Sequence, residues 1–152
     1  MEALPICREM MVMETERYIL DEIGVLTFKD DVTMIKEEEF KGRDDIKKVI
    51  LPGTVDSIGS FAFCGCKALR EVVLEEGVRW IWDGAFRSCY KLKVIQLPAS
   101  LEYICSYAFA YSTGLKKAVI PSNTWIYDHV FEGCDALEKV IIRDVKPSAT
   151  AK

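Results

Sequence analysis

The sequence lacks the residues from which most metal and catalytic sites are built. It has one histidine, His129, in 152 residues, and its only closely spaced cysteines are Cys64 and Cys66. A tetrahedral zinc site needs four Cys or His ligands, usually supplied as two spaced pairs. Neither a GxSxG motif nor a glycine-rich phosphate loop is present, and these motifs mark many hydrolases and nucleotide-binding enzymes. We therefore expect no metal, no cofactor, no catalytic residue and no enzymatic activity.

Long apolar runs are also missing. No segment approaches the roughly 18 apolar residues that a membrane-spanning helix needs. The amino terminus has no basic region followed by an apolar one, which is the pattern of a secretory signal. The chain as given is therefore expected to have no membrane span and to be cytoplasmic.

Basic residues are not in excess. The chain has 20 Lys and Arg against 24 Asp and Glu, for a net charge of −4, whereas nucleic-acid-binding domains are typically basic. We expect no nucleic-acid partner. The charge is unevenly placed, because residues 1–45 carry 6 basic and 13 acidic side chains and residues 46–152 carry 14 and 11.

What the sequence does contain is a repeat. Five phenylalanines are separated by 23, 23, 23 and 22 residues, and the text around each is similar: Phe40, Phe63, Phe86, Phe109 and Phe131. A fixed period of this length is the signature of a solenoid, in which each repeat buries its apolar face only by stacking on its neighbours.

Each repeat contains one short run in which apolar residues alternate, such as Val49-Ile50-Leu51 and Val72-Val73-Leu74. The outer residues of each run are predicted to point inward and the middle one outward, as in a half-buried strand. Three of these runs are followed directly by a proline, which cannot donate to a strand ladder and should end the strand. Each repeat is therefore expected to add one strand to a parallel sheet.

The repeated pattern L-x-x-V-x-L-P-x-x-V-x-x-I-x-x-x-A-F-x-x-C-x-x-L resembles the leucine-rich repeats of the BspA-like (Treponema pallidum type) family, and residues 46–69 and 92–115 follow it closely. The resemblance implies a right-handed leucine-rich-repeat solenoid of the α/β horseshoe class. Short parallel strands would line its concave face, with short helical or irregular turns opposite. It also implies a non-enzymatic binding role, in many relatives adhesion at a cell surface. A secreted or surface location is then the alternative, if a signal has been removed.

Three segments follow from this pattern. Residues 1–39 are expected to form an amino-terminal cap and a partial first repeat, residues 40–142 the array of five copies with the last incomplete, and residues 143–152 a tail. Residues 18–28 read as a strand, a turn and a strand, which resembles the hairpin-like lead-in of this family. Residues 1–17 could be a short helix, with Ile6, Met10 and Met13 on one face, or a strand.

Three of the six cysteines occupy one repeat position: Cys66, Cys89 and Cys134. Strands in a stack lie about 4.8 Å apart, so Cys89 and Cys134, two rungs apart, exceed the roughly 7 Å Cα separation that a disulfide allows. Cys66 and Cys89 are on adjacent rungs, but their side chains should point in parallel. A column of buried thiols is the preferred interpretation over disulfides.

Two surfaces could bind a partner. The first, which we call the sheet strip, is an apolar column on the exposed face of the sheet with lysines beside it: Ile50, Val73, Gln96, Val119, Ile141, Lys48, Lys93, Lys117 and Lys139. Such a strip suits a protein partner with an apolar ridge and acidic flanks. The alternative is that β-branched residues simply favour strands and lysines keep an exposed sheet soluble.

The second surface, the aromatic ladder, lies where the repeats return from the sheet: Trp80, Trp82, Tyr103, Trp125 and Tyr127. The rings flank the repeated isoleucine, and one of the two columns they form is expected to face away from the core. An exposed ladder could contact protein or stack on sugar rings; the alternative is that the rings pack over the turns. His129 occupies the repeat position of Phe61, Gly84 and Tyr107, and we expect a packed or surface ring there.

The end of the array is also informative. The residues after Ile142 are few and polar, so the last strand should leave apolar surface and a backbone edge exposed. This predicts either self-association through the carboxy-terminal end or continuation of the array. Taken together, the sequence predicts a protein-protein interaction module that binds through the concave sheet face, with cell-surface adhesion or carbohydrate binding by the aromatic ladder as the alternative.

Overall fold

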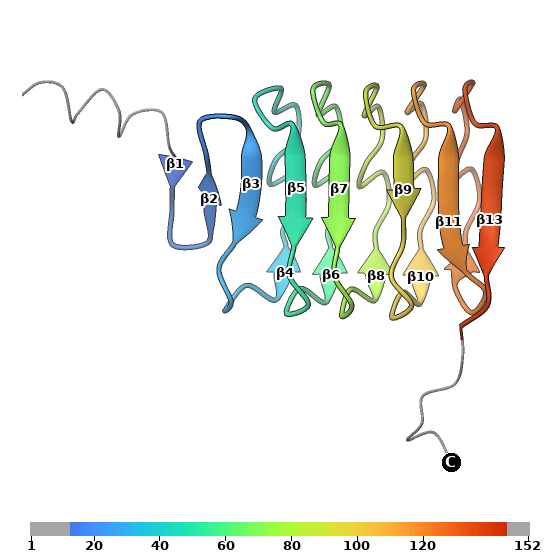
Figure 1. The fold of residues 1–152 in the computed structure, drawn as a ribbon, viewed down its shortest axis with the longest axis horizontal. Helices are drawn as coiled ribbons and strands as arrows, with labels where there is room; N and C mark the ends of the chain where they lie inside the picture. Colours follow the sequence, from blue (N-terminus) through green and yellow to red (C-terminus); the bar gives the residue numbers. More distant parts are fainter. Residues whose placement is uncertain (1–12, 146–152) are drawn as a thin grey trace, which may run out of the picture.

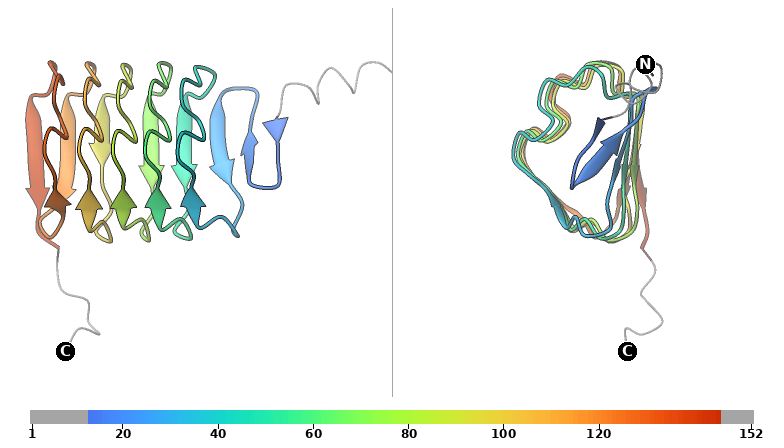
Figure 2. Two further views of the ribbon diagram at one scale, coloured as in Figure 1. Left: turned by 180° about the vertical axis from the view of Figure 1, so that it is seen from behind. Right: turned by 90° about the vertical axis from the view of Figure 1, so that its left-hand side faces the viewer.

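The protein is a stack of coils, each contributing one main strand and one short return strand. The computed structural model describes residues 13–145. Figure 1 shows the main strands side by side, and seen along the stack the coils superimpose closely (Figure 2). The main strands are β3 (Val25–Phe28), β5 (Lys48–Leu51), β7 (Glu71–Leu74), β9 (Val94–Gln96), β11 (Lys117–Pro121) and β13 (Lys139–Arg143). From β3 onward, every strand that pairs with the next main strand does so in parallel, as the repeat predicts.

The return side of each coil forms a second parallel sheet. Its strands have two residues each: β4 (Met34–Ile35), β6 (Ser57–Ile58), β8 (Trp80–Ile81), β10 (Tyr103–Ile104) and β12 (Trp125–Ile126). The turns between the sheets are irregular, and no helix occurs in residues 13–145. Every coil places residues with positive φ in this turn, for example Phe61 (φ 56°) and Tyr107 (φ 60°). Such residues cannot continue a right-handed helix.

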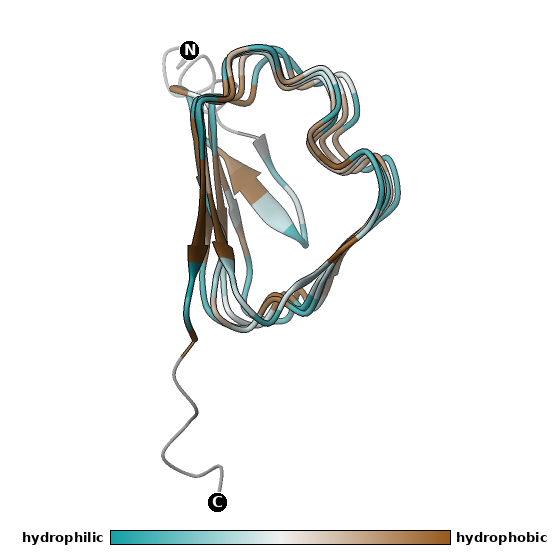
Figure 3. Cartoon of the chain, turned by 90° about the vertical axis from the view of Figure 1, so that its right-hand side faces the viewer, coloured by the Kyte–Doolittle hydropathy of each residue, from teal (hydrophilic) through white to brown (hydrophobic). Residues whose placement is uncertain are grey.

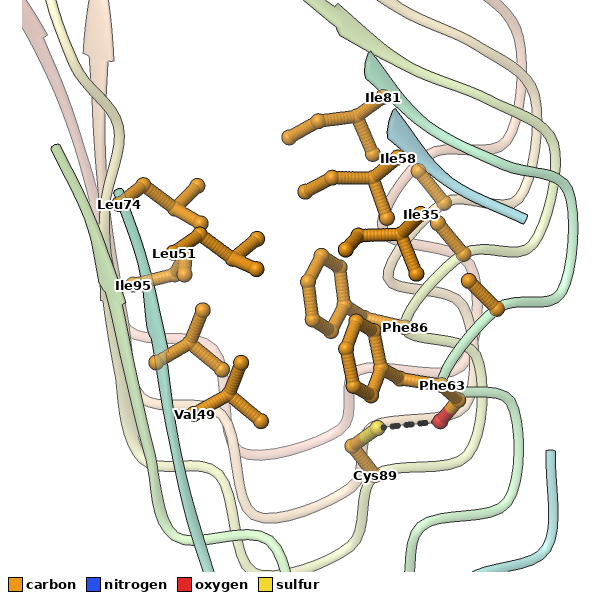
Figure 4. Packing of buried hydrophobic residues seen from close by; sticks show 14 of the residues in the cluster. Ile35, Val49, Leu51, Ile58, Phe63, Leu74, Ile81, Phe86, Cys89 and Ile95 are labelled. Atoms are coloured by element: carbon orange, nitrogen blue, oxygen red, sulfur yellow. Dashed lines mark hydrogen bonds between the residues drawn. The ribbon is translucent and has the colours of Figure 1, made fainter. Parts of the chain in front are cut away.

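Alternation in the main strands fills the core as predicted. In β5, Val49 and Leu51 are fully buried, whereas Ile50 between them is half-exposed. Figure 4 shows these side chains facing the isoleucines of the return strands, Ile35, Ile58 and Ile81. β11 runs one residue beyond the predicted strand end and includes Pro121 as its last residue.

The repeated phenylalanines form a continuous stack through the coils. Ring centroids lie 5.3 Å apart between Phe40 and Phe63, 5.3 Å between Phe63 and Phe86, and 5.4 Å between Phe86 and Phe109. The interplanar angles are 9° or less. Four of the five rings are fully buried. The repeat period therefore appears in space as one column of parallel rings.

The cysteine column is free of disulfides among the described residues, as predicted; Cys66 and Cys89 are buried, whereas Cys134, in the last copy, is only partly buried. The column also has a hydrogen-bonding role that the spacing did not reveal. The Cys66 thiol donates to the Phe40 carbonyl (3.2 Å), and the Cys89 thiol donates to the Phe63 carbonyl (3.3 Å; Figure 4). Ser112, which replaces cysteine in the fourth copy, donates in the same way through its hydroxyl, to the Phe86 carbonyl (2.9 Å).

Burial controls the chemistry of these thiols. Desolvation raises the pKa of Cys66 to about 12 and raises the pKa of Cys89 well above its usual value. The thiolate is the reactive form of cysteine. Both side chains are therefore structural rather than nucleophilic.

An antiparallel hairpin closes the amino-terminal end. β1 (Met13–Glu14) and β2 (Tyr18–Leu20) pair antiparallel, and β2 pairs antiparallel with β3. The part of residues 1–17 that the structure describes thus includes a strand; Ile6 and Met10 lie outside the described residues. Tyr18 meets Phe40 edge-on, with centroids 5.0 Å apart, and this contact caps the ring column.

The carboxy-terminal end is open. Side chains in inward repeat positions are exposed there: Ile126 by 45%, Val140 by 46% and Ile142 by 56%. Figure 3 views this end and shows hydrophobic colouring on the last main strands. The predicted exposure of the last rung is confirmed for the described residues, which end at residue 145.

The thiol column generates a stability prediction. Replacing Cys89 by alanine removes one of two donors to the Phe63 carbonyl, which keeps the Cys66 amide (3.2 Å), and should lower the free energy of unfolding by about 0.5–1.5 kcal/mol. Cys89→Ser should cost less, because serine keeps the donor as Ser112 does in the next coil. Urea denaturation of the two variants measures the difference. A serine variant less stable than the alanine variant would show that the hydrogen bond does not matter.

Candidate functional site

The sheet strip lies where the sequence places it, but the structure divides it. Ile50 faces Val73 in register, and Val119 lies between Gln96 and Ile141. No register joins Val73 to Gln96, because β7 and β9 belong to different sheets. Val119 is only 9% exposed, whereas Ile141 is 36% exposed. The accessible apolar surface is therefore greatest at the carboxy-terminal part of the strip.

The lysines of the sheet strip differ in their partners. Lys48 forms an ion pair with Glu71 (3.3 Å), so its charge is already compensated. Lys117 and Lys139 are direct register partners on β11 and β13. No ion pair within residues 13–145 involves Lys93, Lys117 or Lys139. Like charges opposite each other destabilise a sheet, so this pair costs energy in the isolated protein.

The aromatic ladder is partly formed. Trp80 stacks on Tyr103, with centroids 4.1 Å apart, and on Trp82, 5.1 Å apart. Trp80 and Trp82 flank the buried Ile81, so both columns face outward rather than only one. The reason is that residues on either side of an inward residue share the outer face of a strand.

The carboxy-terminal part of the ladder is open to solvent. Trp125 is 70% exposed and Tyr127 is 54% exposed. Trp125 pairs in register with Tyr103, yet among the described residues no aromatic ring stacks on it. These two rings are available to a ligand, whereas Trp80 is occupied by its neighbours.

A third cluster, which the sequence did not single out, lies on the turns and is called here the ridge cluster: Arg87, Tyr107, Tyr111, His129 and Glu132. Arg87 lies over the ring of Tyr107 (5.9 Å) and over that of Tyr111 (5.0 Å). Tyr107 stacks on His129, with centroids 5.0 Å apart. Glu132 accepts a hydrogen bond from the Tyr111 hydroxyl (2.8 Å) and lies 2.7 Å from His129 Nδ1. The five side chains thus form a closed ring of contacts.

Backbone conformation explains why this cluster was missed. Tyr107, Tyr111 and His129 have φ of 60°, 58° and 62°, a region that bulky residues rarely adopt. Neither strand nor helix periodicity describes the direction of such side chains. In other copies these two repeat positions hold four glycines, Gly42, Gly65, Gly84 and Gly133, all with positive φ, and this is the one signal in the sequence that marks them as left-handed.

The ridge cluster is a surface feature rather than a buried reactive one. The His129 side chain is 54% exposed and that of Glu132 is 38% exposed. The hydrogen bond to Glu132 raises the pKa of Tyr111. In residues 13–145, no three or more His, Cys, Asp or Glu side chains are grouped so that they could hold a metal ion. Within the same residues, no helix has the length and apolar character to cross a membrane.

The sequence of the repeats identifies their family. A profile described as "BspA type Leucine rich repeat region" matches residues 20–146, in six copies. The chain belongs to the BspA-type leucine-rich repeat family. The six copies equal in number the main strands from β3 to β13. Proteins of this kind are generally non-enzymatic modules for protein interaction or surface binding.

Solved structures of bacterial leucine-rich repeat proteins share this BspA-type fold. A leucine-rich cell surface protein from Faecalibacterium prausnitzii is 26% identical, with a TM-score of 0.74 over 84% of this chain and 33% of that one. A leucine-rich repeat protein from Bacteroides ovatus is also 26% identical, with a TM-score of 0.69 over 86% and 38%. The T. pallidum leucine-rich repeat protein is 23% identical, with a TM-score of 0.58 over 80% and 70%.

This repeat protein spans about a third of the length of the first two structures that it matches. No curated protein is significantly similar to it. The Faecalibacterium protein is described as a cell surface protein, and none of these similarities supports the cytoplasmic location expected from the sequence.

The ladder geometry predicts different roles for two tryptophans. Trp80→Ala removes a ring held between two others and should lower the free energy of unfolding by about 1–3 kcal/mol. Trp125→Ala removes an unstacked, exposed ring and should change it by less than about 0.5 kcal/mol. Thermal and urea unfolding of both variants tests this. Equal losses would mean that Trp125 packs as Trp80 does.

Proposed function

We propose that this BspA-type repeat protein is a non-enzymatic interaction module that binds a protein partner through the sheet strip. The observation that carries the proposal is the lysine pair, Lys117 and Lys139, beside the partly exposed Ile141. The pair has no acidic partner among the described residues. An acidic side chain of a partner would relieve the repulsion between the two lysines while its apolar neighbour covers Ile141.

The partner that fits is a protein surface with an apolar ridge flanked by carboxylates. Binding at such a surface is expected to be fast and salt-dependent, because opposite charges steer the encounter. We also propose a secreted or cell-surface location. The description of the similar Faecalibacterium protein as a cell surface protein supports it.

Charge reversal tests the strip without altering its internal repulsion. Lys117→Glu/Lys139→Glu keeps two like charges opposite each other but inverts their sign. A matched control, Lys36→Glu/Lys41→Glu, makes the same net change in the turns before β5. Affinity capture from cell-surface and cytosolic extracts of the source cells should recover a partner with wild type and control, and lose it with the strip variant.

The outcomes separate the parts of the proposal. Capture that survives charge reversal of the strip would exclude this surface as the binding site. A strip-dependent partner found only in the cytosolic extract would support the interaction and contradict the surface location. Circular dichroism of each variant establishes that the fold is intact.

Carbohydrate binding by the aromatic ladder is the second candidate. It is favoured by the exposure of Trp125 and Tyr127, which present rings that no described side chain covers. Aromatic faces of this kind stack on sugar rings. On a glycan array, wild type should bind a neutral glycan and Trp125→Ala should lose it. An array without a hit would remove this candidate.

Self-association through the open end is a further part of the proposal. The hairpin β1–β2 covers the amino-terminal end, so head-to-tail stacking is blocked. Two open ends meeting face to face would give a closed dimer. Sedimentation should show a concentration-dependent dimer that Ile142→Glu abolishes, because a carboxylate would be buried at the junction. A monomer at millimolar concentration would contradict it.

A further inference from the structure

The main sheet is interrupted between the second and third full coils. β7 is the last strand of one sheet and β9 is the first strand of another. Among residues 13–145, no strand pairing joins β7 to β9. The return sheet continues without a break through β6, β8 and β10. Figure 1 shows β7 and β9 set further apart than the neighbouring main strands.

β7 and β9 do not pair anywhere along their length, but the two coils are joined just beyond the carboxy-terminal ends of these strands. Below the strands, Glu76 binds the third coil by accepting hydrogen bonds from the amides of Ala99 (2.9 Å) and Ser100 (2.9 Å). Ser100 returns the contact, because its hydroxyl donates to the Val78 carbonyl (2.8 Å). The coils are therefore tied at one end of the two strands and separated at the other.

A cleft of about 540 Å³ occurs at the separated end. It is lined by Arg70, Tyr90, Lys91 and Lys93 and is called here the seam cleft. Arg70 directly precedes β7 and Lys93 directly precedes β9. Its volume falls within the range of small-molecule sites, about 300–1,000 Å³.

The third repeat alone supplies these side chains at the turn. Tyr90 and Lys91 occupy positions that hold Asp44-Asp45 in the first copy and Thr113-Gly114 in the fourth. The fourth coil packs closely on the other side of this turn, because a Cβ atom at Gly114 would lie 2.2 Å from the Tyr90 carbonyl oxygen. The space around Tyr90 and Lys91 is therefore on the side of the second coil, at the seam.

Three cations surround the cleft without compensation. No ion pair of the described residues involves Arg70, Lys91 or Lys93. Glu71, the residue after Arg70, is paired with Lys48. Three positive charges around one hollow repel one another, and the net charge of the whole protein is negative. A ligand bearing anionic groups would remove this repulsion and form charge-assisted hydrogen bonds.

We propose that the seam cleft binds an anionic sugar carrying two or more sulfate or phosphate groups. The guanidinium of Arg70 suits bidentate contact with an oxyanion, and the two lysines bind further oxyanion groups as point charges. The ring of Tyr90, in a side chain that is 44% exposed, offers an apolar face to the sugar ring. The cleft is a compact hollow at one end of the seam rather than a groove along both strands, which favours a sugar over an extended acidic peptide.

The seam cleft shares Lys93 with the sheet strip but contains neither Lys117 nor Lys139, the pair that carries the proposed function, so its test does not depend on that function. The probe is sucrose octasulfate, titrated at low salt and followed by calorimetry. Inorganic sulfate and uncharged sucrose are the comparison ligands, and a glutamate oligopeptide is the acidic peptide. The full chain is used throughout.

Binding of sucrose octasulfate is expected to fall at least about tenfold in Lys91→Gln/Lys93→Gln, because two charge-assisted contacts are lost. Tyr90→Ala is expected to weaken it about threefold or more, by removing the ring face, and to leave sulfate binding unchanged. The control Lys36→Gln/Lys41→Gln removes the same charge elsewhere and is expected to bind within about twofold of wild type.

Four results would overturn the proposal. The first is that sucrose octasulfate does not bind, and the second is an equal loss of binding in the control, which would mean diffuse attraction to any cation. The third is equal affinity for inorganic sulfate and sucrose octasulfate. The fourth is tighter binding of the glutamate peptide than of sucrose octasulfate. Circular dichroism of each variant separates a lost site from a lost fold.

Discussion

The structure depends on a contact between adjacent coils at each repeated phenylalanine. The Phe63 amide donates to the Ala85 carbonyl of the next coil (2.8 Å), and the Phe63 carbonyl accepts from the Cys89 thiol of that same coil (3.3 Å). The ring stacks on that of Phe86. The Phe63 carbonyl also accepts from the Cys66 amide of its own coil (3.2 Å), whereas the Phe63 amide and ring find these partners only in the neighbouring repeat. A coil standing alone would leave the buried amide unpaired in an apolar surrounding, which is costly.

Because each coil depends on its neighbours, inward and outward positions differ in how much their residues vary between copies. Inward positions must fit the rung above and the rung below, so their identities vary little from copy to copy. Outward positions are free of that constraint, and the differences between repeats gather there. The aromatic ladder, the ridge cluster and the seam cleft each arise because some copies carry large or charged residues where other copies carry different ones.

Charge on the outward positions differs between the two ends of the stack. The amino-terminal coil and cap are acidic, and their ion pairs are made locally, as between Arg17 and Glu39 (2.9 Å). Further along, cations accumulate beside the main sheet without acidic partners among the described residues. A protein with negative net charge thus presents two positive surfaces on its main-strand side, the lysine pair of β11 and β13 and the seam cleft between β7 and β9. Both are suited to anionic ligands, of different kinds.

Two features of the sequence, the period of the phenylalanines and the alternation within each copy, determine the coil, its inward residues and the order of the main strands. These three properties of the fold depend only on the local pattern and on the stacking of similar units. The buried thiols and the open carboxy-terminal end follow from the same reasoning. The outward surfaces required the tertiary structure. Left-handed turns direct Tyr107 and His129 to the ridge cluster, and no hydrophobic period describes them.

The break between β7 and β9 is likewise invisible in a sequence whose repeats are equal in length across it. The break depends on how the second and third coils pack against each other as complete units. Side-chain contacts across coils also decided which predicted groups remain available: Lys48 is compensated by Glu71 and Trp80 is covered by Tyr103, while Lys139 and Trp125 are not. The sequence by itself thus determined the repeated coil, because burial imposes the same period on every copy. Only the packed stack decided which charges stay uncompensated and which rings stay uncovered, because these depend on contacts between side chains of different coils.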